Sequence, residues 1–92
     1  MDMKLGEYEN VKVRTFMWAE LDFVEQYLRA MKKRGVNRVE LAERLGVKPS
    51  YVTRLLSGRA NLTIKTMARM CAAVQCEFST RVFPIPLLRF KK

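Results

Sequence analysis

Between residues 16 and 34, apolar side chains recur at steps of three and four residues, the spacing of one helix face. This pattern predicts a helix over 16–34 that is closed by a basic last turn and Gly35. Its predicted core-facing stripe consists of Met17, Leu21, Val24, Leu28 and Met31. A second apolar row (Phe16, Phe23 and Tyr27) lies beside it, and either broadens the core face or contributes part of a dimer contact.

Residues 38–57 carry two shorter apolar repeats separated by a glycine. The apolar positions fall on one side of a bent pair of helices, and they are Leu41, Leu45, Val47, Val52 and Leu55. Gly46 stands where the first helix must end in a left-handed backbone, and Asn37 is suited to cap its start. Pro49 suits the first turn of the second helix, over 48–57. The residues of this helix expected to point outward are Lys48, Ser50, Tyr51, Thr53 and Arg54.

A further helix is predicted from about residue 64 to 74, with Thr63 as its N-cap. Its expected buried face is Ile64, Met67, Ala68, Cys71 and Val74. Four helices joined by short loops predict an all-α core.

A short stretch in each flank of this core, 11–14 and 77–83, alternates between apolar and polar residues. Residues 11–14 could form a short strand at the end of an N-terminal arm (1–14), with Thr15 capping the next helix. Residues 77–83 also read as a strand, which Pro84 and Pro86 would end. A lone strand needs a partner, which would be residues 11–14 or the same strand of a second subunit. The expected division is therefore an arm (1–14), a helical domain (15–75), and a C-terminal strand with a basic tail (76–92).

The net charge of +9 and pI near 10.1 are typical of proteins that bind polyanions, although charge can also serve solubility alone. No apolar run is long enough to span a membrane. Two cysteines without any histidine do not match a common zinc-site spacing, so we expect reduced thiols in a cytoplasm, with no metal and no cofactor. The sequence contains no catalytic motif, and we expect no enzymatic activity.

Residues 36–74 resemble the DNA-binding domains of the phage-repressor family (lambda repressor/Cro, or XRE). The resemblance is carried by Ala42, Gly46, the apolar set of the two short helices, and the run Leu55–Arg59. It implies a compact lambda-repressor-like bundle of four to five helices containing a helix-turn-helix, in addition to the C-terminal strand. It also implies that helix 48–57 enters the major groove of double-stranded DNA, and that a homodimer binds a near-palindromic operator.

Mapped onto this chain, the resemblance assigns two sets of DNA contacts. The candidates for reading bases are Ser50, Tyr51, Thr53 and Arg54. Arg54 is the first choice, because a guanidinium can donate two hydrogen bonds to guanine. The candidates for contacting phosphates are Arg38, Lys48, Ser57, Arg59, Asn61 and Lys65. Pro49 departs from the family, whose members often carry a base-contacting amide at this position, so the corresponding readout is missing.

Two functions follow as hypotheses. The first is a dimeric transcriptional repressor in a bacterial or phage context, cytoplasmic and associated with the nucleoid. The second is the antitoxin of a toxin–antitoxin module, resembling HigA-type antitoxins, which would bind a toxin protein and also its own operator. Binding of another protein by the flanks (1–14 and 75–92) would distinguish the second hypothesis from the first.

Overall fold

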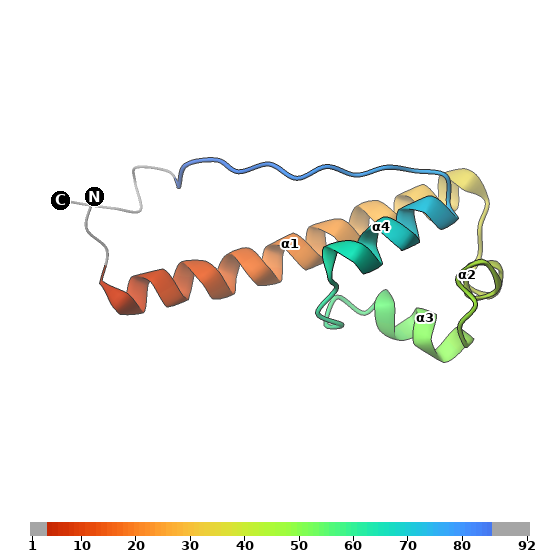
Figure 1. Cartoon of the computed structure of the whole chain (residues 1–92), viewed down its shortest axis with the longest axis horizontal. Helices are drawn as coiled ribbons and strands as arrows, with labels where there is room; N and C mark the ends of the chain where they lie inside the picture. The colour runs from red at the N-terminus through yellow and green to blue at the C-terminus, as the bar shows by residue number, and fades with distance from the viewer. Residues whose placement is uncertain (1–3, 86–92) are drawn as a thin grey trace.

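The computed structural model describes residues 4–85, and within them the chain forms four helices and no strand (Figure 1). These helices are α1 (Leu5–Arg34), α2 (Arg38–Leu45), α3 (Pro49–Leu55) and α4 (Ile64–Ala73). α4 lies along the second half of α1, and α2 packs on both α3 and α4. The all-α prediction is confirmed for the described part of the chain.

α1 is much longer than its apolar pattern predicts. It begins at Leu5, where the Glu7 carboxylate accepts a hydrogen bond from the Lys4 N–H (2.9 Å), and it ends at Gly35 with φ 69°. The predicted strand at 11–14 and the predicted cap at Thr15 are therefore wrong, because both lie inside the helix. A helix satisfies its own backbone hydrogen bonds, whereas a four-residue strand requires a neighbouring strand, and no strand lies within residues 4–85.

The face of α1 that enters the core lies between the two predicted apolar rows. Its buried residues are Glu20, Val24, Tyr27 and Met31. Met17, Leu21 and Leu28, from the predicted stripe, are instead exposed. Tyr27 is only 3% exposed and donates a hydrogen bond to the Met70 carbonyl (2.6 Å), so it belongs to the core and not to a dimer contact. Burial raises its pKa above the ordinary value.

α4 follows the prediction at its start and departs from it along its buried face. The Thr63 hydroxyl accepts a hydrogen bond from the Thr66 N–H (3.0 Å), which confirms the N-cap. Met70, Cys71 and Val74 are buried in the core, but Ile64 and Ala68 are exposed. The helix is rotated from the predicted face because Met70, fully buried, takes the central position.

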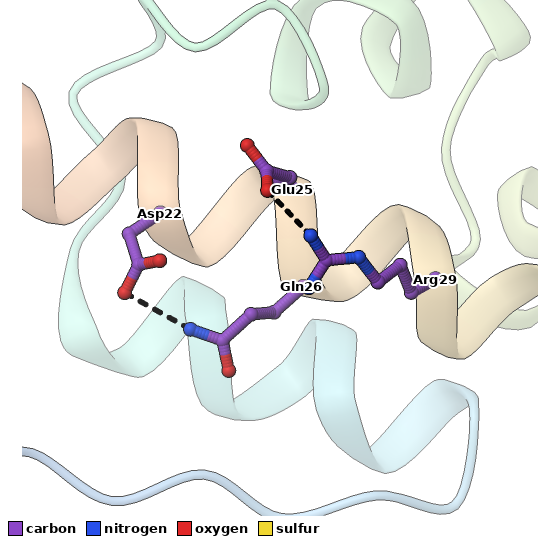
Figure 2. A network of polar contacts seen from close by, with 4 residues as sticks. All are labelled: Asp22, Glu25, Gln26 and Arg29. Atoms are coloured by element: carbon purple, nitrogen blue, oxygen red, sulfur yellow. Dashed lines mark hydrogen bonds and ion pairs between the residues drawn. The ribbon is translucent and has the colours of Figure 1, made fainter.

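The outer face of α1 is polar and is held by pairs one turn apart (Figure 2). Gln26 donates a hydrogen bond to Asp22 (3.0 Å), and Arg29 pairs with Glu25. Such exposed pairs each contribute about 0.2–0.5 kcal/mol to a helix. They identify this side of α1 as a solvated surface.

Residues 77–85 form an extended segment that runs back from α4 along α1 (Figure 1). Phe78 packs edge-on against Phe23 of α1, with ring centroids 5.6 Å apart. No backbone hydrogen bond joins this segment to the rest of residues 4–85. Pairing with residues 11–14 is wrong because those residues are helical, and pairing with the same segment of a second copy stays a prediction. The predicted basic tail (87–92) lies outside the described residues.

The described molecule is elongated, with extents of 52 × 22 × 18 Å. The reason is that the first half of α1 projects beyond the body formed by the other helices (Figure 1). The expectation of a compact bundle therefore holds for the body alone. Several large apolar side chains of the projecting half are exposed, among them Val13, Phe16, Met17 and Trp18.

Candidate nucleic-acid interface

The turn between α2 and α3 fixes the geometry of the candidate interface. Asn37 and Glu40 cap α2 reciprocally: the Asn37 side chain accepts from the Glu40 N–H (2.8 Å), and the Glu40 carboxylate accepts from the Asn37 N–H (3.1 Å). At the other end Gly46 has φ 69°, and the Val47 N–H donates to the Ala42 carbonyl (3.0 Å). Ala42 is itself buried. The predicted cap and turn glycine are both confirmed.

α3 has one buried side and one exposed side. Val52 and Leu55 face the core, with exposures of 0% and 3%. Ser50, Thr53 and Arg54 are exposed, and at about 100° per residue they lie within one arc on the opposite side of the helix. Tyr51 is exposed at the margin of this row. The side chains predicted to read bases thus share an accessible surface.

Two hydroxyl groups of this region make hydrogen bonds inside the motif. Thr53 donates to the Pro49 carbonyl (3.3 Å), which leaves its methyl group and both oxygen lone pairs for a ligand. Ser57 donates to the Arg54 carbonyl (2.7 Å) and accepts from the Arg59 N–H (3.1 Å). These two hydrogen bonds stabilise the turn that carries Arg59. Ser57 is also exposed to solvent.

Two groups of basic side chains bear on the candidate interface. Three arginines donate to backbone carbonyls at helix ends: Arg34 to Gln75 (3.2 Å), Arg44 to Ala73 (2.7 Å) and Arg69 to Leu45 (3.2 Å). The cations predicted to contact DNA are exposed and make no ion pair or side-chain hydrogen bond within residues 4–85; they are Arg38, Lys48, Arg54, Arg59 and Lys65. The first group stabilises the fold, and the second remains available to an anion.

The comparison with protein families agrees with this geometry, because residues 28–80 match the helix-turn-helix family model. The chain belongs to the helix-turn-helix family, of the lambda-repressor (XRE) type. No curated protein and no solved structure matches the chain. Membership makes the protein a DNA-binding transcriptional regulator.

One residue that orders this helix-turn-helix is not apparent from the sequence. Glu20 of α1 is buried, and its carboxylate accepts hydrogen bonds from the N–H groups of Ala60 (2.7 Å) and Leu62 (3.1 Å). Between them stands Asn61, exposed and in the left-handed region with φ 55°. Glu20 thus fixes the α3–α4 loop, which carries two predicted phosphate contacts, Arg59 and Asn61. The available sequence signal was an acidic residue in step with Val24, Tyr27 and Met31.

No group of three or more metal-ligating side chains lies together within residues 4–85. Cys71 and Cys76 are free thiols; burial raises the pKa of the Cys71 thiol, and the neighbouring Cys76 adds to the effect. None of the described helices combines the length and apolar character needed to cross a membrane.

Proposed function

We propose that the protein is a transcriptional repressor that acts as a homodimer on a near-palindromic operator in the cytoplasm, where α3 reads the major groove. The observation that carries the proposal is the row on α3 formed by Ser50, Thr53 and Arg54, exposed directly opposite the buried Val52 and Leu55. A helix that fits the groove and is held rigidly from behind can present such side chains to base edges. Tyr51 is proposed to contact a base or a sugar at the edge of this surface.

Arg54 is the proposed main determinant of sequence. Its guanidinium is exposed and has no carboxylate partner within the described residues, so a guanine O6/N7 pair can accept both of its hydrogen bonds. Thr53 is suited to a thymine methyl group, and Ser50 to either kind of base. Pro49 has no side-chain donor or acceptor, so no direct readout is proposed from that position.

The phosphate contacts are proposed at both ends of the motif. Arg38 opens α2, where the first backbone N–H groups also attract an anion. Lys48, Ser57, Arg59, Asn61 and Lys65 surround α3 from its N-terminus to the start of α4. If about five phosphates are neutralised by each subunit, log K falls with log salt at roughly −0.9 per phosphate, or about −9 for a dimer.

The experiment that tests this proposal is selection of bound sequences from a random pool of DNA duplexes. The proposal predicts a consensus of two inverted half-sites whose centres lie about 34 Å apart, one helical turn. A control protein carrying Arg54→Ala should lose information at one position in each half-site. A pool that returns no consensus would contradict sequence-specific regulation, and a single unrepeated half-site would contradict the dimer.

A second candidate function is an antitoxin that binds a toxin protein and regulates its own operator. The exposed apolar side chains along the first half of α1 favour it, because monomeric proteins rarely leave such surfaces uncovered. A co-encoded small basic ribonuclease that forms a stable complex with the purified chain would support this role. Loss of that complex on changing the flanks, with DNA binding intact, would assign the toxin contact to them.

A further inference from the structure

The first half of α1 contributes no buried residue to the hydrophobic core. None of residues 5–19 is buried by the rest of the described chain, whereas the second half contributes Glu20, Val24, Tyr27 and Met31 to the interior. Isolated helices of about 12–15 residues are marginally stable in water, and most helices depend on burying one face. A partner that covers this half of α1 would therefore stabilise it.

One face of this half has a repeat that suits a second helix. Leu5, Glu9, Lys12 and Phe16 follow each other at steps of four, three and four residues. At about 100° per residue they fall within an arc of roughly 60°, which is the seam of a two-helix contact. Leu5 is 80% exposed and Phe16 51%. Glu9 and Lys12 form only an exposed pair at 3.6 Å, so all four side chains are accessible.

The order of charges along this seam is complementary to itself. When two copies are aligned antiparallel with Glu9 opposite Lys12 of the second copy, Lys12 faces Glu9, and Leu5 faces Phe16. Two ion pairs then form the centre, and an apolar pair stands at each end. A parallel alignment would instead place Glu9 against Glu9 and Lys12 against Lys12, which like-charge repulsion disfavours.

We propose that two copies of this chain pair antiparallel through the seam Leu5–Glu9–Lys12–Phe16, with the two-fold axis between residues 10 and 11. This inference rests on the proposal that the regulator acts as a homodimer, and it names the surface that joins the subunits. The seam is short, so the contact belongs to the small, weak class of interfaces. The central ion pairs set orientation and register, and the apolar ends supply the burial.

The test is sedimentation equilibrium on the full chain, comparing the wild type with Glu9→Lys, Lys12→Glu and an equimolar mixture of the two variants. We expect each variant alone to dimerise at least about tenfold more weakly, because each places like charges at the centre. The mixture should recover the wild-type association, since the lysine introduced into one chain then meets the glutamate introduced into the other. Mixing cannot restore the pair within one helix, so recovery reports contact between chains.

The matched control exchanges charges on the solvated face of α1, with Glu25→Lys and Arg29→Glu. Both controls should dimerise as the wild type does, and circular dichroism should give the same helix content for all variants. The proposal is overturned if the wild type stays monomeric up to millimolar concentrations. It is equally overturned if Glu9→Lys leaves dimerisation unchanged, which would place the contact elsewhere, such as residues 77–83, or if the mixture fails to recover. Selection of a symmetric operator despite these results would leave the proposed function standing.

Discussion

Arg54 differs from the arginines that hold the helix ends together, because its side chain has no partner within residues 4–85. Arg34, Arg44 and Arg69 each donate to a carbonyl at the end of a helix, whereas the Arg54 side chain has no such bond within residues 4–85. It extends from α3 beside Thr53, on the side away from the buried Val52. An accessible guanidinium at this position can donate hydrogen bonds to the edge of a base.

Arg54→Ala should cost about 1–3 kcal/mol of binding free energy on the preferred DNA and relax the preference at one base pair. Titrations on duplexes that differ at single positions measure both effects. Arg29→Ala, on the outer face of α1, is the control and should change neither. An equal loss on every sequence would assign Arg54 to phosphate binding instead.

Arg59 is expected to act through charge alone. Its backbone N–H is held by Ser57, while its side chain is exposed beside the loop that Glu20 fixes. Arg59→Ala should weaken binding to all duplexes alike and make the slope of log K against log salt less steep by about one. Titrations at several salt concentrations measure this slope, and an unchanged value would remove Arg59 from the phosphate contacts.

At the scale of elements, the α3–α4 loop depends on a carboxylate from another helix. Glu20→Gln replaces one carboxylate oxygen by an NH2 group, which cannot accept a hydrogen bond, so only one of the N–H groups of Ala60 and Leu62 keeps its acceptor. Because hydrogen bonds to charged groups contribute about 1.5–3 kcal/mol each, the variant should be measurably less stable. It should also weaken DNA binding, since Arg59 and Asn61 lose their fixed positions.

Thermal unfolding and DNA titration of Glu20→Gln test this role, with the exposed Glu25→Gln as the matched control. Combined with Arg59→Ala, the loss in binding should be smaller than the sum of the two single losses, because both act on the same contact. Additive losses would mean that Glu20 stabilises the fold without positioning the loop.

The α2–α3 turn depends on Gly46. A Cβ at this position would meet no atom within 4 Å, so the constraint is the backbone angle φ of 69° and not space. A left-handed backbone costs an ordinary residue about 1–2 kcal/mol, and a β-branched one more. Gly46→Val should therefore lower the melting temperature clearly, while Gly6→Val, in a helical position with open surroundings, should not. Equal melting curves would contradict this account of the turn.

The helix-turn-helix could be predicted from sequence because local signals there agree with one another. Asn37, Gly46 and Thr63 mark helix ends through their own hydrogen bonding or backbone freedom, and each was assigned correctly. The apolar faces were less certain. On α1 the buried face lies between the two predicted apolar rows, because contacts with α4, such as the hydrogen bond from Tyr27 to Met70, decide which residues face the core and no spacing specifies them.

The parts that failed depend on distant partners. Residues 11–14 alternate like a strand, yet without a neighbouring strand the helix that begins at Leu5 continues through them. From the sequence alone, Glu20 looks like an exposed surface charge. In the structure its carboxylate binds the loop at residues 60–62. Neither outcome can be judged from the neighbouring residues alone: the loop bound by Glu20 lies 40 residues further along the chain, and a strand at 11–14 would need a partner strand from elsewhere.

At the scale of the whole molecule, the fold divides into a body that presents α3 and a helix that projects from it (Figure 1). The body holds the core and the exposed cations around the motif. The projecting half of α1 carries apolar and charged residues that contribute nothing to the core. We infer that the body recognises DNA and that the projection joins subunits, so that symmetry in the protein is matched by symmetry in its site.

The central claim is that α3 distinguishes one DNA sequence from others. Its most direct test is the affinity of the purified chain for its selected site and for a scrambled duplex of the same length and composition, at one salt concentration near physiological. Specific regulators typically prefer their sites by about 10³-fold or more, and we predict a ratio of at least this size. Equal affinities for the two duplexes would contradict the account, because charge alone would then explain the binding.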